Sequence, residues 1–298
     1  MSYSISDLER LSGIQSHTIR IWEQRYNALD PTRSVGNTRL YNDHQLKKLL
    51  NIASLNKSGL KISKICNLSD DAVDKLLNAQ YAVNNVPEAD DFYILQLVNA
   101  GITFDEPIFH SIINSCFEQL GVHQTYRRII YPLLVRIGLL WRTDHVCPSH
   151  EHFLSNLISQ KISAAIELIP PIKDNKNPKW LLFLPEDETH DIGLLFAKYM
   201  LLHKQQNVIF LGARVPIDAI ESVLSTIKID NILVFMSALQ LPDKAQQYLS
   251  ALTKLCTSQR MHLAGNANLI GKLDNIDHIN WIKNVDDFER QITKPTAI

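Results

Sequence analysis

The spacing of hydrophobic residues changes character a little past the middle of the chain. Up to about residue 170, apolar side chains recur every three or four positions, which is the spacing of amphipathic helices. Beyond a polar linker that is bounded by prolines at 170–178, short continuous apolar runs alternate with amphipathic segments. The pattern predicts a helical first part and a second part in which strands and helices alternate.

Five apolar runs in the second part have the length of buried strands. They are residues 180–184, 208–211, 232–236, 262–264 and 278–282. Their alternation with helical stretches predicts a doubly wound, flavodoxin-like parallel sheet over residues 178–298. Ligands of such sheets bind at the carboxyl ends of the strands, and the loop after the first predicted strand carries His190 there. A receiver domain, the nearest rival, needs an aspartate after the third strand, where this chain has Met236 and Ser237.

The middle of the chain predicts a four-helix bundle over residues 88–169. The expected helices are 92–98, 106–120, 122–141 and 148–168. Short breaks separate them at Gly101, at Gly121 and at 145–148, and Thr103 or Asp105 is a candidate cap for the second helix. Pro132 lacks an amide hydrogen, so we expect it to kink the third helix.

The first 75 residues predict a separate head domain. One short helix begins with Ser4 or Ser6 as its N-cap, a second covers 16–25, and Gly13 lies in the turn between them. Two short helices around a glycine turn form a helix-turn-helix, whose second helix enters the major groove of DNA. The expected fold is therefore multidomain, with a winged helix-turn-helix head, a four-helix bundle and a parallel sheet domain.

The predicted wing follows the second helix of the head. Gly36 and Asn37 lie at the centre of a hairpin, and Arg33 and Arg39 flank them. Residues 1–70 hold 10 Lys and Arg against 6 Asp and Glu, a net charge of +4, whereas the whole chain carries −1. Such a local excess suits contact with phosphates, although an excess of this size is also common on a solvated face.

Cysteine usage and hydropathy exclude several classes of protein. The four cysteines are scattered without a Cys-x-x-Cys pair, which argues against a disulfide framework or a structural zinc site. No apolar run approaches the ~18 residues of a membrane span, and the first residues lack the pattern of a signal peptide. We therefore expect a cytoplasmic protein that does not enter a membrane.

The head resembles the DNA-binding domain of the MerR family of regulators. The matching stretches are 18–26, the wing start at 31–33, 37–41 and 59–65. The resemblance implies binding of double-stranded promoter DNA by a homo-oligomer, a dimer or tetramer, on two-fold symmetric sites. The implied DNA contacts are His17 or Thr18 at base edges, Arg20, Arg33 and Arg39 at the backbone, and Tyr41 through a phosphate hydrogen bond. The alternative for each arginine is a surface ion pair of little energetic value.

The loop around His190 resembles the cobalamin-binding signature of methionine synthase-like and mutase-like domains. The matching residues are Glu188-x-His190-x-x-Gly193, Ser237-x-Leu239 and Ala264-Gly265. The resemblance implies that His190 is the lower cobalt ligand and that the nucleotide tail of the cofactor enters the sheet domain. The residue types suit that role, because imidazole is a good metal ligand, Glu188 can orient its ring, and Gly193 leaves room for a bulky ligand. Glu188 replaces the usual Asp, and Ala264 replaces a Gly, which narrows the tail pocket.

A second motif lies in the predicted bundle. Trp141, nine intervening residues, and then Glu151-His152 resemble the adenosyl-sensing motif of CarH- and LitR-like photoreceptors. The resemblance implies that Trp141 sits against the adenosyl group of adenosylcobalamin and that Glu151 and His152 help to hold it. Some members have a histidine directly after the tryptophan, where this chain has Arg142, so the resemblance does not extend to trapping of a light state with two histidines on cobalt. His145 is the nearest substitute.

These motifs together favour a repressor that senses adenosylcobalamin, and light through cleavage of its cobalt–carbon bond, rather than an enzyme. Two alternatives remain open. In the first, the chain is a cobalamin-carrying module of a methyl-transfer enzyme, which would need further substrate domains. In the second, it is a MerR-type regulator that works without a cofactor.

Overall fold

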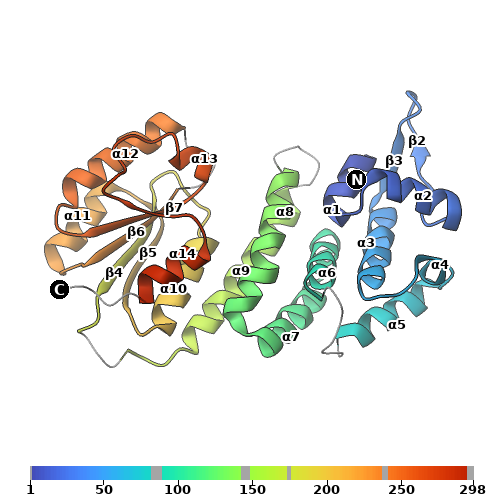
Figure 1. Cartoon of the computed structure of the whole chain (residues 1–298), viewed down its shortest axis with the longest axis horizontal. Coiled ribbons are helices and arrows are strands. Elements are labelled where there is room, and N and C mark those ends of the chain that lie inside the picture. The colour runs from blue at the N-terminus through green and yellow to red at the C-terminus, as the bar shows by residue number, and fades with distance from the viewer. Residues whose placement is uncertain (1, 82–88, 142–147, 173–175, 237–240, 294–298) are drawn as a thin grey trace. The chain divides into compact units, whose positions relative to one another are not determined.

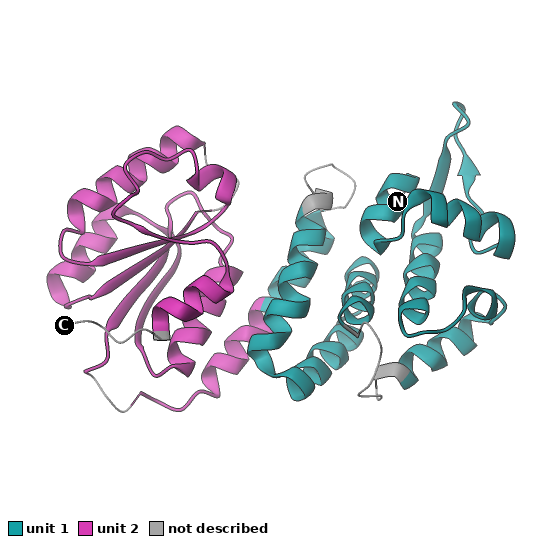
Figure 2. Cartoon of the chain, viewed as in Figure 1, with its two compact units in different colours: residues 1–158 teal, residues 159–298 magenta. Residues whose placement is uncertain are grey.

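The computed structural model describes residues 2–81, 89–141, 148–172, 176–236 and 241–293. The chain divides into two compact units, residues 1–158 and 159–298 (Figure 2). Unit 1 contains the head and most of the helical middle, and unit 2 contains the sheet.

The head contains the expected helix-turn-helix. Helix α1 (Ile5–Ser12) begins at Ser4, whose hydroxyl accepts from the amide of Asp7 while the Asp7 carboxylate accepts from the amide of Ser4. This reciprocal pair satisfies two amides that a helix start leaves open. Gly13 ends α1 with φ 71°, and α2 (Ser16–Tyr26) follows. Ile19 and Trp22 of α2 are buried, as the apolar spacing predicts.

A small antiparallel sheet completes the head. It contains β1 (Ser2–Tyr3), β3 (Arg39–Asn42) and β2 (Thr32–Arg33) in that order, and β2 with β3 forms the wing. The sequence did not predict β1, which is too short to show a periodicity. Helices α3 (Asp43–Lys57), α4 (Ile62–Ile65) and α5 (Asp70–Tyr81) follow the sheet.

The helical middle consists of α6 (Ala89–Thr103), α7 (Glu106–Thr125), the π-helical turn η1 (Tyr126–Ile130), α8 (Tyr131–Trp141) and α9 (Pro148–Glu167). Figure 1 labels α6 to α9. Asp105 caps α7 by accepting from the amide of Ile108. Gly121 breaks the helix as predicted, with φ 74° and ψ 162°. The predicted break at Gly101 is wrong, because α6 continues to Thr103. A Cβ on Gly101 would lie 2.4 Å from Cδ1 of Leu154, so the glycine allows α6 and α9 to pack closely.

Pro132 lies in the first turn of α8, directly after η1. A proline ring collides with the carbonyl four residues earlier in an α-helix. That carbonyl belongs to Arg128, inside η1, where the wider π turn replaces the α-helical pattern. The distortion expected at Pro132 is therefore found one turn before it.

Unit 2 is a five-stranded parallel sheet in the order β5-β4-β6-β7-β8. The strands are β4 (Lys179–Pro185), β5 (Asn207–Val215), β6 (Asn231–Met236), β7 (Arg260–Gly265) and β8 (Asn280–Ile282). The helices are α10 (Ile192–His203), α11 (Ile217–Thr226), α12 (Pro242–Leu255), α13 (Ala267–Ile270) and α14 (Val285–Thr293). This order is the flavodoxin-like one that the alternating pattern predicts.

Both faces of the sheet are covered, α11 and α12 lying on one face and α10 and α14 on the other (Figure 1). Alternate residues of β4 explain this arrangement. Leu181 and Phe183 belong to the apolar cluster that includes α11 and α12, whereas Trp180 packs on Phe288 of α14. No helix in the described part of the chain is long and apolar enough to cross a membrane.

Candidate functional site

His190 lies in the loop between β4 and α10, at the carboxyl end of the central part of the sheet. Two backbone hydrogen bonds fix this loop. The amide of Glu188 donates to the carbonyl of Pro185 at 2.9 Å, and the amide of Arg214 on β5 donates to the carbonyl of Glu188 at 3.2 Å. The loop is thus tied to both strands at the edge where doubly wound sheets bind ligands.

The Glu188 side chain holds the imidazole of His190. Its carboxylate is 1% exposed, and Oε1 accepts from the amides of Thr189 at 2.9 Å and His190 at 3.0 Å. The same oxygen lies 2.7 Å from Nδ1 of His190, whose side chain is 47% exposed. Because a carboxylate can only accept, Nδ1 carries the proton and Nε2 keeps the lone pair that binds a metal.

The described remainder of this edge does not form a metal site. Among the described residues there is no group of three or more His, Cys, Asp or Glu side chains that could hold an ion. A single oriented imidazole suits a metal that arrives with its other ligands already in place. A cobalt ion in a corrin ring is such a metal, since the ring supplies its own set of nitrogen ligands. The donor set of this edge therefore fits the cofactor that the motif implies.

Two positions of the predicted motif hold glycine for different structural reasons. Gly265 has φ 130°, and a Cβ there would lie 1.8 Å from the carbonyl oxygen of Met236, so only glycine fits. That Gly193 leaves room for a ligand stays a prediction, and the structure gives this glycine a further reason. A Cβ on Gly193 would lie 2.8 Å from Cε1 of Phe235, so a side chain of β6 takes up that space. Ser237 and Leu239 lie outside the described residues.

Sequence reasoning missed Arg214, which shares the carboxyl edge with the His190 loop. The pairing of β5 with β4 shifts register twice near its end, and Gly212 and Arg214 have φ of 79° and 60°. Such bulges redirect side chains, and a non-glycine residue with positive φ is strained. Arg214 is exposed, and its guanidinium makes no ion pair or hydrogen bond within the described part of the chain. Gly212, two residues earlier, was the sequence signal that could have indicated this bulge.

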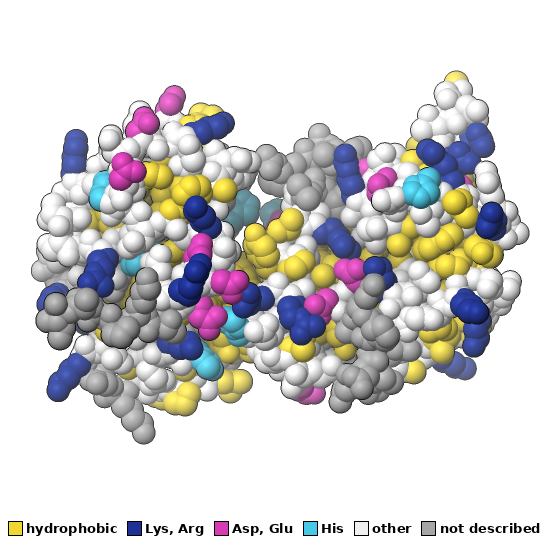
Figure 3. All heavy atoms as spheres, viewed as in Figure 1, with side chains coloured by type: hydrophobic (Ala, Val, Ile, Leu, Met, Phe, Trp, Pro, Cys, Tyr) yellow, Lys and Arg dark blue, Asp and Glu magenta, His cyan; other side chains and the backbone are white. Residues whose placement is uncertain are grey.

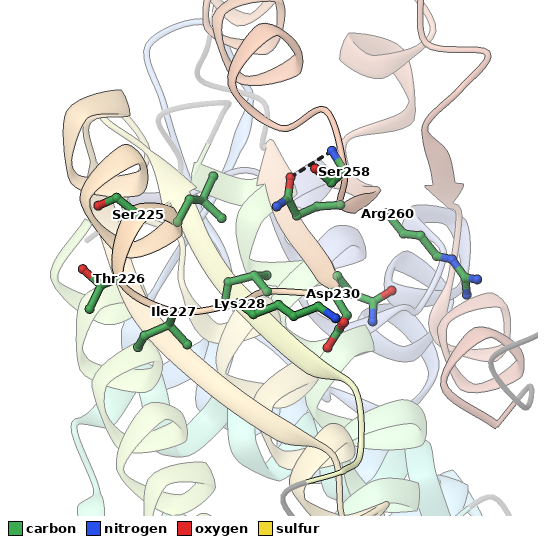
Figure 4. A pocket seen from close by; sticks show the side chains of 11 residues that line it. Ser225, Thr226, Ile227, Lys228, Asp230, Ser258 and Arg260 are labelled. Atoms are coloured by element: carbon green, nitrogen blue, oxygen red, sulfur yellow. Dashed lines mark hydrogen bonds between the residues drawn. The ribbon is translucent and has the colours of Figure 1, made fainter. Parts of the chain in front are cut away.

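The opposite edge of the sheet holds a cavity of about 610 Å³ (Figure 4). Its lining includes Lys228, Asp230, Ser258 and Arg260, at the amino ends of β6 and β7. Asp230 is occupied by structural hydrogen bonds, because Oδ2 accepts from the amide of Lys179 at 2.8 Å. This cavity lies at the amino ends of the strands, whereas His190 lies at their carboxyl ends. None of the predicted site residues lines the cavity.

The bundle motif is only partly described. Trp141 is the last residue of α8, and its side chain lies outside the described part; Arg142 and His145 also do. Glu151 and His152 occupy the first turn of α9, with Glu151 Oε2 3.0 Å from Nδ1 of His152. Ser155, which the sequence did not suggest, donates to Oε1 of Glu151 at 2.5 Å. The side chain of His152 is 72% exposed, so this end of α9 presents an oriented acid–imidazole pair to its surroundings.

The predicted DNA-contact residues of the head occupy two neighbouring elements. On α2, His17 and Arg20 are exposed and Thr18 is half-buried. On the wing, Arg33 is exposed and its Nη1 donates to Oδ1 of Asn37 at 2.6 Å. Figure 3 shows Lys and Arg side chains gathered around the base of the wing. This surface can meet phosphates through charge and base edges through α2.

Tyr41 has a different role from the one expected, and Arg39 takes part in it. Glu23 of α2 accepts from Nε of Arg39 at 3.1 Å and from the hydroxyl of Tyr41 at 2.6 Å. Tyr41 is 1% exposed, and burial together with Glu23 raises the pKa of its hydroxyl. The expected hydrogen bond from Tyr41 to a phosphate therefore does not suit this structure. The three side chains instead fix the wing strand to the recognition helix.

Two parts of the chain match known families. Residues 3–71 match the family described as MerR HTH family regulatory protein, and residues 93–166 match the family described as B12 binding domain. The first match covers the head, and the second covers α6 to α9 rather than the sheet.

Two transcriptional repressors are similar to most of the chain. The HTH-type transcriptional repressor CarH of Myxococcus xanthus is 26% identical over 220 residues, which are 72% of this chain and 72% of that protein. The HTH-type transcriptional repressor CarA of the same organism is 24% identical over 86% of this chain and 84% of that protein.

The fold also resembles a solved structure, the monomethylamine corrinoid protein of Methanosarcina barkeri. It has a TM-score of 0.52 and 16% identity, and it covers 65% of this chain and 94% of that one. At that identity the likeness concerns the fold alone. The head and bundle matches, however, concern sequence, and the chain therefore combines a head that matches MerR regulatory proteins with a helical part that matches B12-binding domains.

Proposed function

We propose that this chain binds promoter DNA as a homo-oligomer, and that adenosylcobalamin bound at the His190 edge of the sheet controls this binding. The observation that carries the proposal is the His190–Glu188 pair, in which a buried carboxylate orients a half-exposed imidazole. Because the buried carboxylate holds Nδ1, Nε2 is the ring nitrogen that can bind a metal.

Each motif residue has a task in this proposal. His190 is the lower ligand of cobalt, and Glu188 holds its ring and raises its basicity. Gly265, with Ser237 and Leu239, lines the path of the nucleotide tail. Arg214 adds an exposed cation at the same edge, where its donors suit the carbonyl oxygens of the amide groups around a corrin.

The bundle motif is the sensor part of the proposal. Trp141 packs against the adenosyl group, and Glu151, held by Ser155, works with His152 to bind it through hydrogen bonds. Adenosylcobalamin supplies a cobalt–carbon bond that green light breaks. Because Arg142 stands where some relatives have a second histidine, we expect a light state without a two-histidine adduct.

The head delivers the output. His17 and Thr18 face base edges, Arg20, Arg33 and Arg39 contact the backbone, and Glu23 keeps the wing in register with α2. A two-fold symmetric oligomer matches a two-fold symmetric operator, and loss of the oligomer weakens DNA binding. The names of the relatives support a repressor.

The test uses the full chain kept in the dark with adenosylcobalamin. We expect a protein-bound spectrum that changes under green light, and DNA affinity that changes with it. His190→Ala should reduce cofactor affinity at least about 100-fold, as expected for loss of a metal ligand. His278→Ala, an exposed histidine of the same unit, should not change it.

Two outcomes would point to the alternatives. Methyl transfer from bound methylcobalamin to a thiol or amine would support a corrinoid carrier. DNA affinity that is equal without cofactor, with cofactor and after light would support a regulator that works without one. Equal cofactor binding by wild type and His190→Ala would reject the ligand assignment.

A further inference from the structure

The DNA-binding head packs directly on the bundle inside unit 1. Helix α3 lies along α6, and α1 contacts α6 and α8. Buried hydrogen bonds cross this contact. Nε2 of Gln96 donates to the hydroxyl of Ser54 at 2.8 Å, and Nδ2 of Asn99 donates to Oδ1 of Asn51 at 3.1 Å. The head–bundle contact, defined by α1 and α3 against α6, α8 and α9, is thus partly polar.

Two buried nitrogen atoms on the bundle side of this contact have no hydrogen-bond partner among the described residues. They are Nη1 of Arg136 on α8 and Nδ1 of His150 on α9. Arg136 reaches the carboxyl end of α1, because its Nη2 lies 3.6 Å from where a Cβ would stand on Gly13. Burial lowers the pKa of both side chains. Buried polar atoms without hydrogen-bond partners disfavour the arrangement that buries them.

A buried water molecule does not satisfy Nδ1 of His150. His150 is 8% exposed and lines a cavity of about 10 Å³ together with Leu11 of α1, Ile137 of α8 and Leu154. This is roughly the smallest space that holds one water, and a water needs two to four polar partners. The other lining side chains are apolar. The cavity therefore offers free volume for repacking between α1 and α9.

His150 also stands next to the sensor motif. Its ring packs on Phe104, with 4.8 Å between ring centroids, while Glu151 and His152 follow it on α9. Successive residues of a helix point in directions about 100° apart, so one turn presents His150 to the head and His152 to solvent. A rotation or shift of α9 that begins at Glu151 and His152 must move His150 against α1.

We propose that the head–bundle contact has two alternative packings, and that Arg136 and His150 are the positioning residues that set the balance between them. Hydrogen bonds and apolar packing favour the packing seen here, and the two unsatisfied nitrogens oppose it. Binding at the Glu151–His152 end of α9 then shifts the balance and changes how the head is held for DNA. This inference rests on the proposed function, because it needs a ligand at that end of α9.

The test measures thermodynamic coupling in the full chain. The probe is a double-stranded fragment that the wild-type chain selects from a random-sequence pool, and its Kd is measured in the dark with and without adenosylcobalamin. We expect the two Kd values of the wild type to differ by about tenfold or more, within the usual range of allosteric coupling. Arg136→Met and His150→Phe keep the approximate shape and remove the unsatisfied nitrogen. In both variants the ratio of the two Kd values, measured with and without adenosylcobalamin, should fall to about two or less.

A second readout separates this role from simple structural support. Replacing an unsatisfied buried polar group by an apolar one of similar shape stabilises the packing that buries it. We therefore expect the melting temperature of both variants to rise, with an unchanged spectrum of bound cofactor. If either variant fails to fold, Arg136→Leu and His150→Leu remove the same nitrogens and give the same ratio measurement.

Matched controls come from the same bundle. His110→Phe removes another histidine whose buried Nδ1 has no partner among the described residues, but which lies on α7. Arg128→Met removes an arginine that pairs with Asp90 at the surface. Both controls should keep the wild-type ratio. If folded variants of both Arg136 and His150 keep the wild-type ratio of Kd values, this inference is overturned but the proposed function is not. A ratio of one in the wild type itself overturns the proposed function as well.

Discussion

Buried polar groups are hydrogen-bonded more completely in the sheet unit than at the head–bundle contact. In the sheet unit, Glu188 accepts three hydrogen bonds, and His262 sits between Gln291 at 2.7 Å and Asn231 at 3.2 Å. Nε1 of Trp180 is an exception among the described groups. At the head–bundle contact, nitrogens of Arg136 and His150 lack partners among the described residues. The proposal requires this difference: a fixed platform, which is the sheet unit around His190, and a head–bundle contact that changes around His150.

The largest effect on stability is expected at the carboxyl edge of the sheet. Gly265→Ala should lower the free energy of unfolding of the sheet unit by about 3 to 4 kcal/mol, from a strained φ and a collision with the backbone of Met236. Chemical denaturation of the full chain measures this change.

The matched control is Gly59→Ala in the head. Gly59 also has a positive φ, 97°, but no atom lies within 4 Å of the point where its Cβ would stand, so this variant carries the strain without the collision. A loss at Gly265 no larger than that at Gly59 would show that β6 and β7 do not approach each other as described.

The second effect concerns the pH dependence of the platform. Burial lowers the pKa of His262 from 6.5 to about 4. The unfolded chain therefore takes up a proton first as the pH falls, and stability decreases between pH 6.5 and about 4. The decrease should reach about 3 kcal/mol, by the usual free energy of each pKa unit.

Unfolding curves at several pH values in this range test this prediction. His262→Phe should remove most of the pH dependence, whereas His278→Ala, at an exposed position, should retain it. Equal slopes for wild type and His262→Phe would mean that His262 is not buried as a neutral ring.

A smaller effect is expected inside the head–bundle contact. Ser54→Ala removes the nearer acceptor of Gln96 Nε2 and should cost about 1 to 2 kcal/mol. Replacing both residues, as Ser54→Ala with Gln96→Leu, should cost less than the sum of the single changes. Strict additivity in this double-mutant cycle would contradict a direct hydrogen bond across the contact.

The smallest effect is expected where the contact reaches solvent. Lys57 Nζ lies 3.0 Å from Oδ2 of Asp91, and both side chains are partly exposed. Lys57→Met should change stability by less than about 0.5 kcal/mol, because exposed ion pairs contribute little. A melting temperature several degrees lower would show that charge, rather than the buried hydrogen bonds, holds the head on the bundle.

The features that depend on neighbours in the sequence could be predicted, and those that depend on distant partners could not. The parallel sheet, the cap at Ser4 and the Glu188–His190 pair follow from local spacing. The reason for Gly193 depends on Phe235 of another strand, and the role of Tyr41 depends on Glu23 of another helix. The apolar pattern of α1 or α6 shows that one face is buried but not which element covers it. The packing of the head on the bundle, and hence the position of Arg136 and His150, was therefore out of reach.

Electron paramagnetic resonance of bound cob(II)alamin tests the central claim, that His190 is the axial ligand of cobalt. One sample contains the chain with ¹⁵N-labelled histidine, and the other contains the unlabelled chain. If His190 binds cobalt, labelling should change the superhyperfine splitting from triplets to doublets, and His190→Ala should abolish the doublets. Triplets that persist in the labelled chain would show that the cofactor keeps its own base as ligand, and would contradict the account.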